Sequence, residues 1–287
     1  MPDIAQARVR VGAVDVWSVR ESGVADHVAE AWRRAEGGAI VTANVDIVRA
    51  ATRSPELAAL IAESELVVAD GMPVVWAGRL AGVPVPERVT GSSLVFTLAE
   101  AAAREGRSLY LLGGEPGVPE KAADVLCAKY PGLRVVGTDS PAFGFETSAD
   151  ATAETVAKAV EAEPDLVFVG LGFPKQERLI RLLRADLPAS WFLGCGAGIP
   201  MAAGEFRRAS GVVQKLGAEW LHRLALEPRR LAKRYLRDDL PFAFRLLGGA
   251  LRTRFRRPAA DGVGNQTDVD GVGNQTEVDR VGNRTGE

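Results

Sequence analysis

Short apolar runs alternate with longer amphipathic stretches through most of the chain. The runs are four or five residues long and rich in branched side chains, which is typical of strands buried on both faces of a parallel sheet. Most are followed by a turn and then by apolar residues at helical spacing. They cover residues 39–42, 66–69, 109–112, 133–137, 166–169 and 191–195. This alternation predicts an α/β fold, a Rossmann-like doubly wound parallel sheet with right-handed crossovers.

The N-terminal residues have a different pattern. Valines alternate with polar or small residues on both sides of Gly12, and this spacing predicts a short hairpin or a pair of edge strands. The valines are Val9, Val11, Val14 and Val16.

Residues 164–177, PDLVFVGLGFPKQE, join a buried strand to a helix. Gly170 and Gly172 let the backbone leave the sheet steeply, and Pro174 suits the first helical position. Ligands bind at such junctions in open α/β sheets, because a helix N-terminus offers free N–H groups to an anion. The polar residues 175–177 would then open a helix at a site. The alternative is that the glycines only make a turn, since a G-x-G without its third glycine is a weak motif.

A second junction places a carboxylate at the end of a strand. Asp70 follows the apolar run 66–69, Gly71 makes the turn, and Pro73 begins a helix that reaches Leu80. Asp70 is either the N-cap of that helix or a carboxylate whose proton affinity is raised by partial burial, as a general base requires. The local pattern alone favours the cap.

Arg88 precedes a Thr-Gly-Ser turn at the expected start of another helix, which ends near Arg104. It is either a solvated loop charge or a side chain that holds a phosphate through its planar guanidinium group. The sequence leaves both alternatives open.

The composition is that of a soluble globular protein. Of the 287 residues, 47% are hydrophobic and 25% are charged, and the formal net charge of −2 by itself indicates no class of partner. No apolar run reaches the roughly 20 residues that cross a bilayer, and the N-terminal residues lack the apolar core of a signal peptide. We therefore expect a cytoplasmic protein without a membrane span.

Cysteine and histidine are too scarce for some kinds of site. Two cysteines, Cys127 and Cys195, suit a reduced compartment better than a disulfide framework. The histidines are His27 and His222, which argues against a His-built metal site or a Ser-His-Asp triad. The carboxylates form no cluster that suggests a metal, so none is expected.

The pattern changes at about residue 212, after which it is helical and, over residues 223–257, strongly basic. These residues form either a solvated surface packed on the main domain or an amphipathic attachment on an anionic membrane surface. Nucleic acid is not expected, because no recognised binding motif accompanies the basic run.

The last part of the chain is a repeat, DGVGNQTDV, DGVGNQTEV and DRVGNRTGE, with little to bury. Such a composition predicts disorder. The sequence thus predicts an α/β core over residues 1–211, a basic helical C-terminal appendage over 212–257 and a disordered repeat tail over 258–287.

Motifs spread over residues 10–240 together resemble the WecG/TagA/CpsF glycosyltransferases. These are bacterial enzymes that add N-acetylmannosamine, or a related sugar, from a UDP donor to an undecaprenyl-diphosphate-linked sugar. Each motif is weak alone, but their order and spacing are specific. They are Thr42-Ala43-Asn44, Ala69-Asp70-Gly71, Glu87-Arg88-Val89-Thr90-Gly91, LLGG at 111–114 with Pro116-Gly117-Val118, Tyr130-Pro131-Gly132-Leu133, PDLVFVGLGFPKQE, and Glu219-Trp220-Leu221-His222-Arg223 followed by Glu227-Pro228.

The resemblance implies an inverting glycosyltransferase of surface-polysaccharide synthesis, such as cell-wall teichoic acid synthesis. Asp70 would be the base that takes the proton from the acceptor hydroxyl, which reverses the preference from the local pattern. Thr42 and Asn44 would hydrogen-bond to donor or acceptor hydroxyls. Arg88 and Gln176 would orient the sugar-nucleotide and stabilise the departing UDP.

The resemblance also implies roles for the glycine turns and the appendage. The turns at Gly113 and Gly172 would let the diphosphate or the base approach closely. Arg223, Arg230 and Arg234 would contact the lipid diphosphate where the protein lies on the inner face of the plasma membrane. The UDP-sugar would be the donor substrate, no cofactor or metal would be needed, and a homo-oligomer is left open.

The chain departs from the family pattern at three places. Ile199-Pro200 replaces a usual Phe-Asp pair, Arg208-Ala209-Ser210 replaces Arg-Ala-Pro, and Ser93 stands where Asp is common. The donor and acceptor sugars therefore stay open.

Two functions from other classes remain as alternatives. A dinucleotide-dependent oxidoreductase would also use glycine turns, although no strand end carries a full G-x-G-x-x-G with an acidic residue about 20 positions on. A catalytically silent UDP-sugar-binding scaffold would fit the altered motifs.

Overall fold

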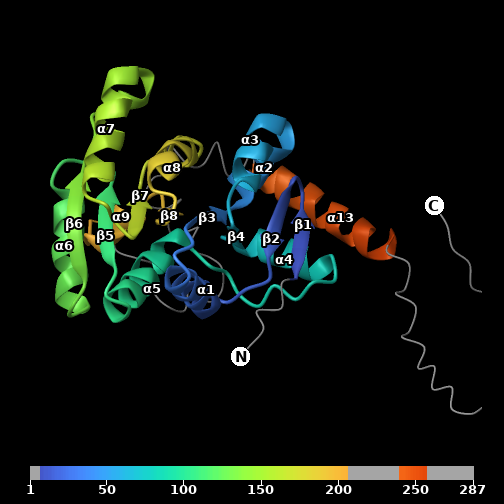
Figure 1. Ribbon diagram of the computed structural model, residues 1–287. Helices are drawn as coiled ribbons and strands as arrows, with labels where there is room; N and C mark the ends of the chain where they lie inside the picture. The colour runs from blue at the N-terminus through green and yellow to red at the C-terminus, as the bar shows by residue number, and fades with distance from the viewer. Residues whose placement is uncertain (1–6, 206–238, 257–287) are drawn as a thin grey trace, which may run out of the picture. The chain divides into compact units, whose positions relative to one another are not determined.

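The computed structural model describes residues 7–205 and 239–256 of the chain. Within these ranges a six-stranded parallel sheet has the order β4–β3–β8–β7–β5–β6 (Figure 1). The predicted parallel α/β sheet is therefore confirmed. Its strands are β3 (Gly38–Ala43), β4 (Leu66–Ala69), β5 (Ser108–Leu112), β6 (Arg134–Asp139), β7 (Leu166–Val169) and β8 (Trp191–Gly194).

The predicted N-terminal hairpin is also present. Strands β1 (Arg8–Val11) and β2 (Val14–Trp17) pair antiparallel and form a separate two-stranded sheet. Gly12 has a φ of 60°, a left-handed conformation that glycine adopts without strain. The hairpin valines are buried in one cluster with side chains of β3 and β4, so the hairpin extends the core beyond the main sheet.

Helices cover both faces of the sheet (Figure 1). One face carries α1 (Glu21–Arg33), α5 (Gly91–Arg104), α6 (Val118–Lys129) and α9 (Gly198–Ala202). The other carries α2 (Val45–Arg53), α3 (Pro55–Ala62), α4 (Met72–Leu80), α7 (Ala149–Glu161) and α8 (Lys175–Asp186).

Strands β3, β4, β5, β7 and β8 are buried along their whole length, as their continuous apolar runs predict. The edge strand β6 is partly exposed, so the expectation of burial on both faces is wrong for the run 133–137. On β7, Leu166 and Phe168 join the core beneath α1, α5 and α6, whereas Val167 and Val169 join the core beneath α7 and α8. All four side chains are fully buried. Since the strands are parallel, all their carboxyl ends lie along one edge, and the turns that follow them share that edge.

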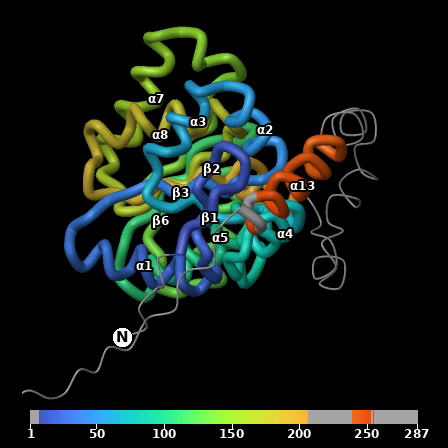
Figure 2. Tube along the Cα trace, turned by 90° about the vertical axis from the view of Figure 1, so that its right-hand side faces the viewer, coloured from blue at the N-terminus to red at the C-terminus, as the bar shows by residue number. Residues whose placement is uncertain are grey.

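Helix α13 (Leu240–Arg256) packs against α4 and α2 (Figure 2). Leu246 is 7% exposed and belongs to the same apolar cluster as the hairpin and α4. Arg49 of α2 forms an ion pair with Asp239, just before α13, at 3.3 Å. The predicted basic appendage is thus helical where it is described. Residues 206–238 and the repeat tail lie outside the described residues.

The start of α8 differs from the prediction. Pro174 occupies the N-cap rather than the first helical position, and the Phe173–Pro174 peptide bond is cis. The helix begins at Lys175.

Candidate active site

The carboxyl ends of β3 and β4 bring three of the predicted site residues together. The backbone N–H of Asp70 donates to the carbonyl of Ala43 at 2.9 Å, which places Asp70 beside Asn44. The N–H of Val89 donates to the carbonyl of Ala69 at 2.8 Å, which brings the preceding Arg88 to the same strand end. We call Asn44, Asp70 and Arg88 the carboxylate half of the site.

Gly71, with a φ of 125°, occupies the N-cap position of α4, so the local prediction that placed Asp70 there is wrong. A φ of this sign suits glycine, and it turns the chain into the helix one residue after the carboxylate. Asp70 is half-buried at the strand end.

Asn44 is a cap, although the sequence interpretation gave it only a binding role. Its Oδ1 accepts a hydrogen bond from the N–H of Ile47 at 3.0 Å, which satisfies the first turn of α2. The residue is exposed, and the capping bond does not use the amide nitrogen. Asn44 is therefore held rigidly while it still offers two N–H donors.

Thr42 lies one step inside β3 and is only 7% exposed. A Cβ atom added to Gly91, the first residue of α5, would lie 3.3 Å from Thr42 Oγ1 and 3.2 Å from the carbonyl oxygen of Cys195. Thr42 therefore packs against the start of α5, and Gly91 allows that helix to approach β3 and β8 closely.

The carboxyl ends of β5, β7 and β8 meet through backbone alone. A Cβ added to Gly113 would lie 2.7 Å from the carbonyl oxygen of Gly170, and one added to Gly170 would lie 2.9 Å from that of Gly196. Side chains are therefore excluded at these contacts. We call Gly113, Gly170, Gly172 and Gly196 the glycine half of the site.

Gln176 ties the glycine half together. Its side chain is buried at 3% exposure, and Oε1 accepts hydrogen bonds from the N–H groups of Gly172 and Gly196, both at 3.1 Å. Its Nε2 donates to Oε1 of Glu177 at 2.9 Å. The structure thus gives Gln176 partners inside the protein, where the sequence interpretation expected a direct contact with the sugar-nucleotide.

Glu177 is a feature that sequence reasoning missed. It is 4% exposed, and burial raises the pKa of its carboxyl group to about 7. A glutamate in the first turn of a helix is ordinarily a solvated residue that favours the helix dipole. Only its neighbours in the fold reveal that this one points inward.

The two halves occupy different parts of the sheet edge. Strands β3 and β8 lie between β4 and β7, so the carboxyl ends of β4 and β7 are about 14 Å apart at roughly 4.8 Å for each pair of neighbouring strands. Gln176 lies nearer to β4 than this, because it contacts Gly196 at the end of β8. The site is therefore an elongated edge with Asp70, Asn44 and Arg88 together at one end.

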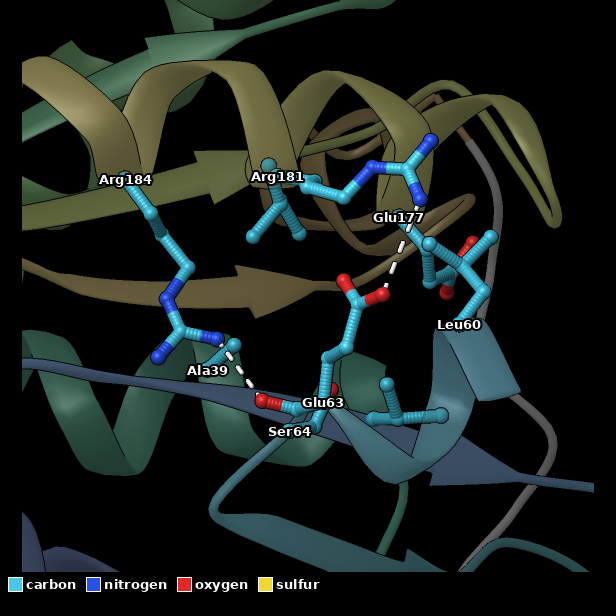
Figure 3. A pocket seen from close by; sticks show the side chains of 9 residues that line it. Ala39, Leu60, Glu63, Ser64, Glu177, Arg181 and Arg184 are labelled. Atoms are coloured by element: carbon cyan, nitrogen blue, oxygen red, sulfur yellow. Dashed lines mark hydrogen bonds and ion pairs between the residues drawn. The ribbon is translucent and has the colours of Figure 1, made fainter. Parts of the chain in front are cut away.

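A small pocket lies apart from this edge, between α3 and α8 and alongside β3 (Figure 3). Its charged side chains are paired with other groups. Arg181 pairs with Glu63 at 3.6 Å, and Arg184 donates to the carbonyl oxygen of Glu63 at 2.8 Å (Figure 3). Glu177 lines the pocket and also accepts the hydrogen bond from Gln176, the residue that ties the glycine half together.

Comparison with known proteins decides the family. The Glycosyl transferase WecG/TagA/CpsF family profile matches residues 9–256. The chain belongs to the WecG/TagA/CpsF family. The resemblance drawn from the motifs is confirmed, and membership of a glycosyltransferase family sets aside the oxidoreductase alternative.

Two curated relatives illustrate the similarity within this family. An N-acetylglucosaminyldiphosphoundecaprenol N-acetyl-beta-D-mannosaminyltransferase of Staphylococcus aureus (strain MRSA252) is 32% identical over 195 residues, which are 68% of this chain and 74% of the relative. A protein of the same name from Bacillus spizizenii (strain ATCC 23059 / NRRL B-14472 / W23) is 28% identical over the same shares.

Some expectations for a WecG/TagA/CpsF enzyme concern residues outside those that the structure describes. Arg223, Arg230 and Arg234 lie outside the described residues. In the parts that are described, no group of three or more His, Cys, Asp or Glu side chains is arranged to hold a metal ion. No helix within those parts has both the length and the apolar character needed to span a membrane.

Proposed function

We propose that this protein is an inverting, UDP-sugar-dependent transferase that moves N-acetylmannosamine, or a closely related N-acetylhexosamine, onto an undecaprenyl-diphosphate-linked sugar. Family membership and the names of the two relatives support the reaction class and the acceptor. The observation that carries the proposal is the position of Asp70, which is half-buried at the end of β4, beside Asn44 and Arg88 and one residue before the N-cap of α4.

In the proposed reaction, the Asp70 carboxylate takes the proton from an acceptor hydroxyl as its oxygen attacks the anomeric carbon of the donor. The bond between that carbon and the UDP oxygen breaks, and UDP departs with the bonding electron pair. A single displacement of this kind inverts the anomeric configuration. Asn44 donates hydrogen bonds to a sugar hydroxyl, and buried Thr42 acts by holding the start of α5 against β3.

The departing diphosphate carries the negative charge that the protein must stabilise. Arg88 supplies a planar cation beside Asp70. In the glycine half, Gly172 has a φ of 77° and no atom within 4 Å of an added Cβ, so a ligand can approach its backbone closely. Gly113, which is buried and has a φ of 111°, allows the close contact with Gly170. We assign the nucleotide to the glycine half and the reacting hydroxyl to the carboxylate half.

We further propose that the protein works as a peripheral protein on the inner face of the plasma membrane, where a lipid-linked acceptor resides. Helix α13 supports this location. Its side chains Phe244 and Leu251 are exposed at 68% and 43%, and the helix carries Arg245, Arg252 and Arg254. Apolar side chains among arginines suit an anionic lipid surface. Arg223, Arg230 and Arg234 would meet the lipid diphosphate.

A panel of UDP-sugars assayed with undecaprenyl-diphosphate-linked N-acetylglucosamine tests the proposal. We expect transfer with UDP-N-acetylmannosamine or a close relative, and a rise in melting temperature with UDP but not with NAD. Stabilisation by UDP without transfer from any donor would instead support the silent scaffold. No stabilisation by UDP would contradict both.

A further inference from the structure

Glu177 stands out among the buried groups because its carboxyl group is only partly satisfied. Oε1 accepts one hydrogen bond from Gln176. Oε2 is buried and has no hydrogen-bond partner in the described parts of the chain. Burying a carboxylate in this way is costly unless the fold gains something from it.

We propose that Glu177 is a positioning residue of the transferase, which acts through Gln176 to hold the turns after β7 and β8 at one separation. The proposal rests on the proposed function, because those turns belong to the half to which we assign the nucleotide. Glu177 is too deeply buried to touch a substrate, so it acts only through its neighbour.

The chemistry of the Gln176 amide explains why an acceptor is needed at Glu177. The amide presents an oxygen on one side and an NH2 group on the other. Its oxygen must face the N–H groups of Gly172 and Gly196, since both are donors. The NH2 group is then turned toward Glu177, whose Oε1 accepts from it. Without that acceptor, the buried NH2 group loses its partner, and the amide is held from the oxygen side alone.

Gln176 and Glu177 pack directly against β8. A Cβ atom added to Gly194, the last residue of β8, would lie 2.6 Å from Nε2 of Gln176 and 3.2 Å from Oε1 of Glu177. The two side chains therefore occupy the space next to Gly194. Gly194 is a glycine because the pair occupies the position of its side chain.

The protonation state of Glu177 also affects the stability of the protein around the Gln176–Glu177 pair. Burial raises the pKa of Glu177 to about 7, and nearby charges are committed elsewhere. On α8, Arg181 pairs with Glu63 at 3.6 Å and Arg184 pairs with Glu65 at 2.5 Å. Raising the pH through 7 therefore creates a buried anion without a counter-ion, which lowers the stability of the folded protein. A glutamine in place of Glu177 accepts the same hydrogen bond and does not ionise.

The test compares Glu177→Met, which keeps the volume but removes the acceptor, with Glu177→Gln, which keeps the acceptor. The first readout is hydrogen exchange of the Gly172 and Gly196 amides, which needs no activity. We expect exchange at both amides to rise about tenfold in Glu177→Met and to stay near the wild-type rate in Glu177→Gln, as loss of one hydrogen bond predicts. Unchanged exchange in a folded Glu177→Met variant would overturn the proposal.

The second readout is transfer kinetics. In Glu177→Met the KM for the UDP-sugar should rise about tenfold while kcat changes by less than about threefold, and Glu177→Gln should restore KM. If amide exchange rises in Glu177→Met but the wild-type protein transfers no sugar, the positioning role is supported and the proposed function is contradicted. If Glu177→Met does not fold, Glu177→Leu, which also lacks the acceptor, takes its place in both readouts. The same KM in Glu177→Leu and Glu177→Gln would overturn the proposal.

Discussion

The carboxylate half and the glycine half of the candidate site lie on one edge of the same sheet, yet they are built in opposite ways. At the ends of β3 and β4, polar side chains stand at the surface, with Asn44 fixed by a capping bond and Asp70 left out of the cap. At the ends of β5, β7 and β8, the polar side chain Gln176 is buried and the turns contact one another through glycine backbone.

This difference indicates a division of labour. Proton transfer requires a side chain at a defined place, whereas the close contacts between the turns of the glycine half require positions without a side chain. Removing atoms should therefore harm the carboxylate half, and adding atoms should harm the glycine half. Each prediction below tests one side of this contrast.

The largest effect is expected from Asp70→Asn. The amide cannot take a proton from the acceptor hydroxyl, so kcat should fall by roughly a hundredfold or more. The affinity for UDP, measured by calorimetry, should stay close to that of wild type. Turnover near the wild-type rate would remove Asp70 from the mechanism.

Gly113→Ala should weaken UDP binding and leave kcat largely preserved. The new Cβ would lie 2.7 Å from the Gly170 carbonyl oxygen at a φ of 111°, so we expect a loss of about 2–3 kcal/mol in unfolding free energy and weaker UDP binding. Gly117→Ala is a matched control: its φ is 85°, but no atom lies within 4 Å of the added Cβ. The control should cost about 1 kcal/mol and leave UDP affinity unchanged. Equal effects of the two variants would show that backbone contact is unimportant.

The stability of the glycine half should depend on pH through Glu177. Its pKa is about 7 in the folded protein against 4.5 for the free side chain. The folded state therefore binds more protons between these values, and stability falls as the pH rises from 4.5 to 7. The loss should be on the order of 2 kcal/mol and absent in Glu177→Gln. Denaturant unfolding of both proteins from pH 5 to 8 measures it, and parallel curves would contradict the assignment.

The smallest effect separates the two roles of Asn44. Asn44→Ala removes the cap of α2 and should lower the unfolding free energy by about 1 kcal/mol. Asn44→Ser keeps a capping oxygen but lacks the amide donors, so it should recover stability without recovering transfer. Full activity in Asn44→Ser would limit Asn44 to a structural role.

Much of the fold followed from the spacing of apolar residues. The run 166–169 was expected to be a strand buried on both faces, and β7 has those bounds. The carboxyl ends of parallel strands share an edge, so the sequence also placed Asn44 and Asp70 near each other.

Other features depend on contacts between residues far apart in the chain. Gln176 faces inward because the N–H of Gly196, which follows another strand, donates to it. Glu177 is buried because the neighbouring helices and strands cover it. The N-cap of α4 is Gly71 rather than Asp70 because of the backbone conformation that joins β4 to α4. No local pattern reports these contacts. The roles of Arg223, Arg230 and Arg234 stay predictions.

The most direct test of the divided site is a crossed comparison of kcat and the UDP dissociation constant in Asp70→Asn and Gly113→Ala. Our account predicts that kcat falls in the first variant with UDP affinity preserved, and that UDP affinity falls in the second with kcat at saturating donor largely preserved. A fall in kcat in both variants, or a fall in UDP affinity in both, would contradict the assignment of the chemistry to one half and the nucleotide to the other.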